Sequence, residues 1–546
     1  MSAHILTWKD GMATKPVNLD ALIIRQDFLS SEGPEVGESE KRSVSITDLR
    51  KGESFYASLR KPDFQRETAA WTPEAICEFV KSFIDSDLIP TVICWQNPAR
   101  LSFVIDGAHR ISAIIAWILN DYGDGSESRK FYGGQIPLEQ EKLAQKTRML
   151  IQKEVGLYSE LTAELQNPGT YPARAKNARS LAHAGIPLQW IKSVDWRKAE
   201  RAFFTINQSA VRIDPTELKI LNARTEPNAI ASRAIVRNAT GHKYWEKFSE
   251  AGKIELEATA KKIYSALYSP PLDLPIRTVE LPIAGHGYGS QTLPLIYEFV
   301  NVANNIPVKD PSKEPQKLQT GERSEVDEQK VLSLLRNTEK LTQRFTGTNE
   351  SALGLLPAIY FYSANGRHQP TAVLAMAFLI MDFEHKDKFL RFTSIRKKFE
   401  EFLISHKFYV NQLTLRYGSL TKGFRPLKEL YEFVIDGLLN GKTETELEGL
   451  LRDSEKFHFL SSERIIKTAQ TKDFSGKAKQ LAFISEHLMN AGKCPICGAR
   501  KDNKSITADH TQDKKFGGLG TTDNLQFLHP YCNSAKDALI AMGVSP

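Results

Sequence analysis

The chain has 546 residues, so several domains with sizeable buried cores are expected, and a small peptide-like module is excluded. Hydrophobic residues make up 41% and charged residues 25%, which excludes a collagen-like or wholly disordered protein. The net charge of +7 permits contact with nucleic acid but does not establish it. The longest apolar run, Ala372 to Met381, is too short to cross a bilayer, and no secretory signal opens the chain. We therefore expect a cytoplasmic protein without membrane contact.

The first part of the chain predicts an arm followed by an α/β domain. Residues 1–43 end in a polar, acidic stretch with few apolar side chains, which indicates an N-terminal arm. Further on, Thr72 and Pro73 have the features of a helix start, as N-cap and first helical residue. Two apolar runs, 92–95 and 101–105, flank a short Pro-containing turn and predict a pair of adjacent strands.

The remaining divisions follow from changes in composition. A helix that begins at Arg197 is expected to stop at Asn207. Residues 308–330 carry almost no apolar side chains, as is typical of a linker. The expected organisation is an arm at 1–43, a nucleotide-binding α/β domain at 44–225, a helical extension at 226–307, a linker at 308–330, a helical middle domain at 331–475 and a C-terminal domain at 476–546.

Two segments of the helical middle domain resemble functional motifs, but ordinary helix structure explains both. Residues 437–443 resemble a phosphate-binding loop, but they are one residue short and follow a helical pattern where such a loop needs a strand. Gly441 is instead expected to close one helix, and Thr443 with Glu446 to form the capping box of the next. The basic run 396–398 is interpreted as the solvated face of an amphipathic helix, and a DNA contact by the same face stays open.

The cysteines indicate a metal site near the C-terminus. Five cysteines in so long a chain cannot be a disulfide framework, and three of them lie in its last tenth. Cys494 and Cys497 form one Cys-x-x-Cys pair, and His529 with Cys532 forms a second pair with the same spacing. Tetrahedral zinc accepts such a set, and a small segment with little core would gain stability from it. A zinc knuckle without catalysis would explain these four residues, but not the polar residues between them.

The polar residues between the two pairs have the chemistry of a hydrolytic site. Successive strand side chains point to opposite sides, so Asp509 can hold a divalent ion while His510 faces a water. Asn524 can hydrogen-bond across the loop to orient His510, and Asn533 can offer the ion a second oxygen. Lys536 falls on the same helical face as Asn533, where it can meet a phosphate.

Residues 494–537 resemble an HNH endonuclease domain, the ββα-metal finger, in its variant with Asn in the third position and a structural zinc. This resemblance implies that His510 is the general base that activates water against a phosphodiester, with Asn524 positioning it. It also implies that Asp509 and Asn533 bind Mg²⁺ or Mn²⁺.

Two positions depart from the HNH pattern. His529 replaces the more usual cysteine of the second zinc pair, and residues 511–513 replace the apolar-x-Pro that commonly follows Asp-His. Two alternatives therefore stay open: His529 is a third catalytic histidine and zinc is absent, or the domain is an inactive remnant.

A second candidate site lies in the α/β domain, at residues 106–110 with the sequence Asp-Gly-Ala-His-Arg. The glycine permits a turn between strand and helix, the first helical N–H groups can hold an anion, and Arg110 can add a bidentate phosphate contact. Gln65 and Arg66 precede the first helix, and Asn207 follows a later one. Each of these signals is weak when taken alone.

Taken in this order, the motifs resemble the DGQQR/DGQHR-type nucleotidase domain of the ParB/sulfiredoxin-like superfamily, found at the front of Gmr-type modification-dependent restriction enzymes. Ala108 stands where that family commonly has glutamine, so we expect binding of a nucleoside triphosphate and leave its hydrolysis open. The residues that the resemblance implies around the nucleotide are Gln65, Arg66, Asp106, Gly107, His109, Arg110 and Asn207.

We therefore predict an α+β multidomain protein with a ParB/sulfiredoxin-like α/β domain, a helical middle region and a C-terminal HNH finger with structural zinc. The predicted function is a nucleotide-regulated DNA endonuclease of restriction or anti-phage defence that acts on modified phage DNA, with homo-oligomerisation left open. Lys514, Lys515 and Lys536 are the expected DNA contacts. The alternatives are a ParB-like nucleotide-dependent DNA-binding regulator whose zinc finger is not catalytic, and an HNH-type RNase or toxin.

Overall fold

The computed structural model describes residues 15–28, 41–63, 65, 67–134, 136–193, 195–210, 219–220, 223, 225–272, 276–287, 292–310, 326–461 and 474–544. They fall into two compact units. The first, here called the sheet unit, holds the described residues up to Ala210 together with Thr240–His242. The second, the helical unit, holds the other described residues. Every helix in the described part is too short or too polar to span a membrane.

The sheet unit is built on six short strands in the order β1-β3-β5-β4-β6-β2. Neighbouring strands are parallel except in the pairs β4–β5 and β2–β6. The β4–β5 pair confirms the two adjacent strands that the sequence predicted. The strands are β1 (Ile24–Gln26), β2 (Ser43–Ser45), β3 (Leu59–Pro62), β4 (Val92–Gln96), β5 (Ser102–Asp106) and β6 (Gly185–Trp190).

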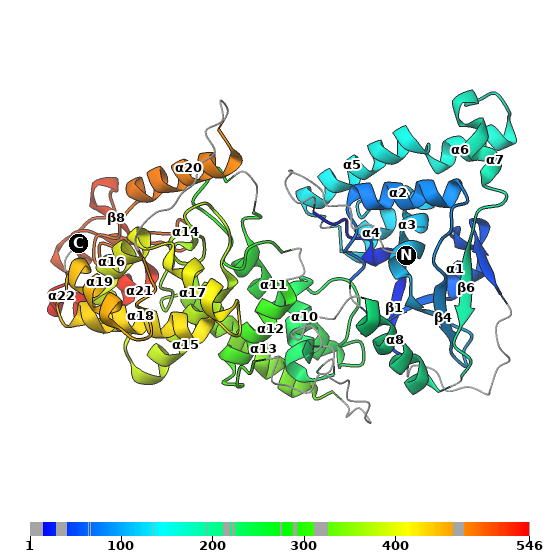
Figure 1. Cartoon of the computed structure of the whole chain (residues 1–546). Coiled ribbons are helices and arrows are strands. Elements are labelled where there is room, and N and C mark those ends of the chain that lie inside the picture. The colour runs from blue at the N-terminus through cyan, green and yellow to red at the C-terminus, as the bar shows by residue number, and fades with distance from the viewer. Residues whose placement is uncertain are drawn as a thin grey trace. The chain divides into compact units, whose positions relative to one another are not determined.

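Helices cover this sheet, and α2 packs against α3 and α5 while α8 packs against β5 (Figure 1). As predicted, α2 begins at Pro73 and the Thr72 hydroxyl accepts a hydrogen bond from the Ala75 N–H at 3.3 Å. The helices of the sheet unit are α1 (Ser54–Ser58), α2 (Pro73–Ile84), α3 (Ala108–Leu119), α4 (Ser126–Phe131), α5 (Leu138–Glu154), α6 (Tyr158–Gln166), α7 (Ala175–Ser180) and α8 (Trp196–Ala210). The prediction that the last of them stops at Asn207 is wrong, because Asn and Ser lower helix propensity by only a fraction of a kcal/mol.

Residues 15–28, which the sequence assigned to an N-terminal arm, belong to the sheet unit and contribute its edge strand β1. A buried ion cluster ties them in. The Asp20 carboxylate accepts hydrogen bonds from Arg25 Nη2 at 2.8 Å and Lys61 Nζ at 2.6 Å, and all three side chains are buried. Arg25 also donates to the carbonyl oxygens of Asp63 and Gln65, so this cluster supports the loop that follows β3.

The helical unit has one continuous apolar core, which contains residues from Ile230 to Leu488. The predicted helical extension and helical middle domain share this core. Its helices are α10 (Pro227–Val236), α11 (Glu250–Tyr268), α12 (Thr292–Ala303), α13 (Glu328–Phe345), α14 (Pro357–Tyr360), α15 (Pro370–Lys386), α16 (Phe389–Ser405), α17 (Tyr409–Tyr417), α18 (Phe424–Leu439), α19 (Glu444–Asp453) and α20 (Gly476–Asn490). Most of the predicted linker, residues 311–325, lies outside the described residues.

The turn between α18 and α19 confirms the capping interpretation of residues 437–443. Gly441 follows the end of α18 with a φ of +76°. The Thr443 hydroxyl accepts from the Glu446 N–H at 3.3 Å, and the Glu446 carboxylate accepts from the Thr443 N–H at 2.7 Å. These residues are used to end one helix and start the next.

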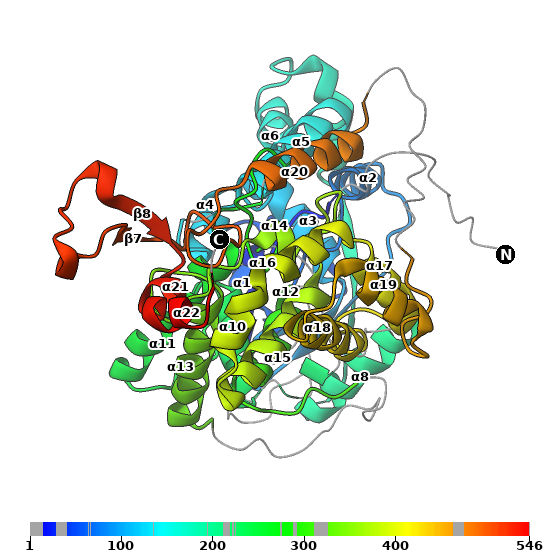
Figure 2. The ribbon, with the colours of Figure 1, turned by 90° about the vertical axis from the view of Figure 1, so that its left-hand side faces the viewer.

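The C-terminal part of the helical unit, residues 493–544, is called the finger below. It contains the antiparallel hairpin of β7 (Thr507–His510) and β8 (Leu525–Leu528), followed by α21 (Pro530–Ser534) and α22 (Lys536–Ala541). In this hairpin Asp509 pairs with Gln526, and His510 pairs with Leu525. Figure 2 shows the hairpin extending away from the helices of its own unit.

Candidate metal centre and active site

The four predicted metal ligands come together in the finger. Cys494, Cys497, His529 and Cys532 are all buried, and their ligand atoms lie within 4.8 Å of one another. The His529 Nδ1 atom is 3.5 Å from the Cys497 sulfur and 3.8 Å from the Cys532 sulfur. Tetrahedral zinc with ordinary bond lengths places such atoms about 3.5 Å apart. Hydrogen bonds from the Cys497 and Cys532 thiols lower the pKa of Cys494, which favours the thiolate form that binds metal.

Backbone contacts orient these ligands. The His529 Nε2–H donates to the Arg500 carbonyl at 3.1 Å, so Nδ1 is left to face the sulfurs. In the first pair, the Cys494 N–H donates to the Ala499 carbonyl at 2.8 Å. The Gly498 N–H in turn donates to the Cys494 carbonyl at 2.9 Å, in a turn where Gly498 has a φ of +69°. The three thiols and one imidazole therefore form a closed set that fits a structural zinc ion.

Asp509 lies on β7 and is ion-paired. Its Oδ2 atom accepts hydrogen bonds from Lys536 Nζ at 2.6 Å and from Gln526 Nε2 at 3.0 Å. Although partial burial would raise the pKa of Asp509, these hydrogen bonds lower it below its ordinary value. Lys536, which the sequence predicted to meet a phosphate, also donates to the His510 carbonyl at 3.1 Å. Asp509 is therefore ionised, and one of its oxygens already carries a cationic partner.

Two other predicted site groups, the His510 imidazole and the Asn533 amide, are not engaged by described residues. His510 is half-buried, and no hydrogen bond or ion pair holds its imidazole within the described residues. The Asn533 amide likewise has no partner among the residues that the structure describes, and its helix α21 packs against β7. One carboxylate and one amide oxygen are hard donors of the kind that Mg²⁺ and Mn²⁺ prefer. The residues present thus fit a divalent cation beside an available imidazole.

Asn524 holds the loop that follows His510. Its Oδ1 atom accepts from the Gln512 N–H at 2.7 Å, and its Nδ2 donates to the carbonyls of Gln512 at 3.1 Å and Leu519 at 2.8 Å. Gly518 makes the close packing possible, since a Cβ there would lie 1.7 Å from the Gln512 carbonyl oxygen. Asn524 therefore acts on the loop geometry.

The same loop is basic and partly apolar at its surface. Lys514 and Lys515 are both exposed. Lys515 lies 3.5 Å from an Asp513 oxygen, whereas Lys514 has no ion pair in the described part of the chain. Phe516 and Leu519 are each 71% exposed. This surface offers a positive charge next to the hairpin that carries His510.

In the sheet unit, Gly107 and Arg110 shape the start of α3. Gly107 is the N-cap with a φ of +97°, and a Cβ there would lie 2.6 Å from the Val92 side chain. The Arg110 guanidinium is paired with the Asp106 carboxylate and donates to the Pro90 carbonyl at 2.6 Å. Arg110 therefore has acceptors within the protein, next to the N–H groups that open α3.

The segment that follows Gln65 and Arg66 in the chain contacts the start of α3. The Ala70 N–H donates to His109 Nε2 at 3.3 Å, and the Trp71 ring lies 5.8 Å from the His109 ring. Gln65 has a buried Oε1 atom with no hydrogen-bond partner in the described residues. Arg66 and the side chain of Asn207 lie outside the described residues.

Two segments of the chain match known protein families. Residues 46–225 match the N-terminal domain of the GmrSD restriction endonuclease, and residues 494–538 match the HNH endonuclease. Comparison with curated proteins and with solved structures found no match. Both matched families are families of endonucleases, and the two matches lie in separate parts of the chain.

A buried polar group that the sequence pattern does not reveal lies next to the finger. Arg396, which was interpreted as part of a solvated face, is 1% exposed and pairs with Glu400 at 2.9 Å. The interpretation is wrong for Arg396, because α16 packs this side of the helix inside the unit, whereas Lys398 is exposed. The only sequence feature that indicates this pair is the i,i+4 spacing of Arg396 and Glu400 on one helix.

Proposed function

We propose that this chain is a nucleotide-regulated DNA endonuclease of restriction or anti-phage defence that hydrolyses phosphodiester bonds at a single-metal HNH site and acts on modified phage DNA. The observation that carries the proposal is the pairing on β7 of an ionised Asp509 with a His510 imidazole that no described residue engages. A general base needs such an imidazole, and a metal site needs such a carboxylate.

The chain's own residues divide the work. His510 takes a proton from the attacking water, and Asn524 keeps the loop behind it in place through its three hydrogen bonds. Asp509 and Asn533 would hold the divalent cation, which would polarise the scissile phosphate and stabilise its developing charge. Lys536 balances the Asp509 charge and is close enough to the metal site to contact a phosphate once that pair opens.

The four-ligand cluster is assigned to structural zinc in this proposal. All four side chains are buried, so the cluster leaves no open position for a substrate. The small finger would then owe its fold to the metal. His529 serves here as a zinc ligand rather than as a catalytic histidine.

The sheet unit would supply the regulation. The match to the GmrSD N-terminal domain supports a nucleoside triphosphate site there, as do Gly107, His109 and Arg110 at the N-terminus of α3. A nucleotide bound at one site can control cleavage at another only if it favours one state of the protein over another. Hydrolysis of the nucleotide is not needed for this role.

The test is a cleavage assay on the full chain. Unmodified plasmid and modified phage DNA are incubated with protein, Mg²⁺ and each nucleoside triphosphate in turn. Cleavage is expected in at least one condition, and it should disappear in His510→Ala. It should persist in the control His385→Ala, which removes an exposed histidine distant in sequence from His510. DNA that stays intact under every condition would exclude the nuclease. Salt-sensitive binding without nicking would favour the DNA-binding regulator, and cleavage of labelled RNA alone would favour an RNase.

A further inference from the structure

Glu400 of α16 is connected to a predicted zinc ligand by two consecutive hydrogen bonds. It is fully buried, and its Oε2 atom accepts from the Arg500 N–H at 2.7 Å. The carbonyl of the same residue, Arg500, accepts from His529 Nε2 at 3.1 Å. A carboxylate of the helical core therefore fixes the backbone position that orients the His529 imidazole.

The other oxygen of Glu400 is fixed just as firmly. Its Oε1 atom accepts from Arg396 Nε at 2.9 Å and from the Tyr360 hydroxyl at 2.9 Å. Arg396 also donates to the carbonyls of Leu353 and Gly354. Oε1 is thus held by residues of the helices, while Oε2 accepts from Arg500 of the finger.

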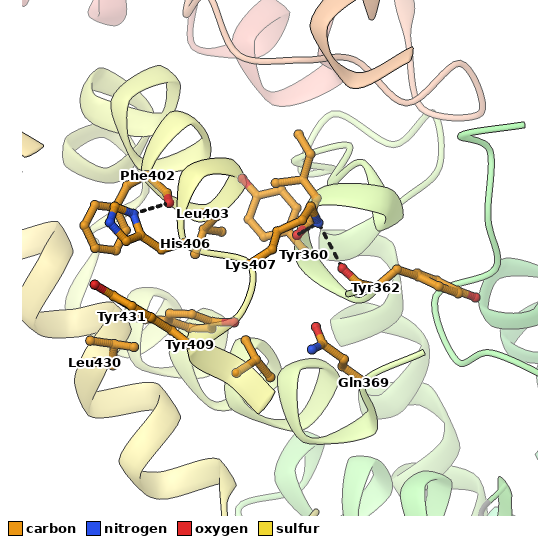
Figure 3. Close-up of a pocket in the computed structure, with 12 residues that line it drawn as sticks. Tyr360, Tyr362, Gln369, Phe402, Leu403, His406, Lys407, Tyr409, Leu430 and Tyr431 are labelled. Atoms are coloured by element: carbon orange, nitrogen blue, oxygen red, sulfur yellow. Dashed lines mark hydrogen bonds between the residues drawn. The ribbon is translucent and has the colours of Figure 1, made fainter. Parts of the chain in front are cut away.

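The elements that hold Glu400 are themselves anchored. Tyr360 lies at the end of α14, where the buried Lys407 ammonium donates to the carbonyls of Ala358 at 2.5 Å, Ile359 at 3.1 Å and Tyr362 at 2.9 Å. Figure 3 shows Tyr360 and Lys407 side by side on the wall of a small, mainly aromatic cavity. The lysine occupies the carbonyl acceptors that the end of a helix leaves unused, so α14 is pinned where Tyr360 needs it.

The segment next to α14 also touches the ligand directly. A Cβ at Gly354 would lie 3.1 Å from His529 Cδ2 and 2.8 Å from the Ser505 carbonyl oxygen. The Tyr531 N–H donates to the Ala352 carbonyl at 3.0 Å. The imidazole of His529 is therefore enclosed on one side by the finger and on the other by residues of the helical core.

We propose that Glu400 is a positioning residue of the metal centre, supplied by the helical core: it orients the His529 imidazole through Arg500, with Arg396 and Tyr360 holding the carboxylate. The inference rests on the zinc site proposed above. A buried ion pair adds little net stability, because desolvation offsets most of the attraction. The expected contribution of Glu400 is therefore to ligand geometry, and outer partners of metal-bound histidines commonly change metal affinity about 10–100-fold.

The test compares Glu400→Gln with Glu401→Gln in the zinc-loaded full chain. Glutamine keeps the shape of the side chain but presents an N–H₂ group to one of the donors that the carboxylate accepts. Glu401 is the next residue of α16 and has no hydrogen bond or ion pair to another described residue. We expect Glu400→Gln to release zinc to a colorimetric chelator about 10–100-fold faster than wild type, and Glu401→Gln to release it at the wild-type rate. In the Co²⁺-substituted proteins, the ligand-field bands should shift in Glu400→Gln only, which a loss of packing alone would not produce.

Each outcome decides a different point. If the wild-type protein binds neither Zn²⁺ nor Co²⁺, both the proposed metal centre and the role of Glu400 are refuted. Wild-type binding with unchanged release and an unchanged Co²⁺ spectrum in a folded Glu400→Gln would overturn only the role of Glu400. If Glu400→Gln does not fold, Tyr360→Phe replaces it, since it removes one hydrogen bond to Oε1 without disturbing a charge. A smaller increase in zinc release and a smaller spectral shift are then expected, and wild-type values would overturn the inference.

Discussion

Removal of zinc is expected to unfold the finger while the rest of the helical unit stays folded. Apart from the three cysteines, the finger's own buried cluster contains Ile496, Ala499, Leu528 and Leu539. Burial of the three large side chains contributes about 5–9 kcal/mol, at about 1.5–3 kcal/mol each. A structural zinc ion contributes about 10–16 kcal/mol. The metal therefore supplies the larger share, and the apolar cluster is too small to replace it.

The measurement is hydrogen–deuterium exchange before and after chelation, with zinc content determined on the same samples. The amides of Cys494, Gly498 and Asn533 are hydrogen-bonded in the finger and should lose protection. Amides in α15 and α18, which belong to the large apolar core, should keep theirs. Full protection of the finger in protein shown to be metal-free would refute the reasoning, because the apolar cluster would then suffice.

Three further predictions concern single residues. Gly518→Ala is expected to abolish DNA cleavage without changing zinc content, because the added Cβ would lie 1.7 Å from the Gln512 carbonyl oxygen; a plasmid nicking assay and metal analysis check this. Lys61→Met is expected to destabilise the sheet unit by about 3–5 kcal/mol in denaturant unfolding, because the buried Asp20 loses one of its cations. Arg110→Ala is expected to weaken nucleoside triphosphate binding about tenfold to hundredfold in a fluorescence titration, since a hydrogen bond to a charged group contributes about 1.5–3 kcal/mol.

Each of these changes has a matched control. Gly520→Ala adds a methyl group to the same loop where no atom lies within 4 Å, and it should cleave DNA like wild type. Lys153→Met removes a lysine that is 79% exposed and should leave stability within about 0.5 kcal/mol. Arg100→Ala removes an exposed arginine from the β4–β5 turn and should bind nucleotide normally. A control that behaves like its partner variant would contradict the assigned role.

Local patterns in the sequence were sufficient for the elements whose contacts are local. The Thr72–Pro73 helix start, the β4–β5 strand pair and the Thr443–Glu446 capping box each depend on residues only a few positions apart. The four candidate metal ligands could also be predicted from the sequence, because cysteine and histidine pairs with fixed spacing have few structural uses other than metal binding. The structure brings all four of its members together.

The parts that the sequence could not show depend on distant partners. Strand β1 has only three residues, too few for a period-two pattern, and the contact between Asp20 and Lys61 joins residues 41 positions apart. The burial of Arg396 is decided by Leu353 and Gly354, which precede it by more than 40 residues. A run of charged residues on a helix has the same sequence pattern whether a loop buries it or it faces solvent.

The finger is hydrogen-bonded at several points to segments that follow helices α11 and α13. Lys504 donates to the Ser269 carbonyl at 2.7 Å, Ser505 to Gly347 at 2.6 Å and Ser534 to Glu350 at 3.0 Å. The finger therefore depends on contacts with the rest of the helical unit. Fusing residues 494–538 to an unrelated protein would leave these donors without acceptors and one side of the His529 ring uncovered. A functional fusion would therefore have to include the preceding helices of the unit.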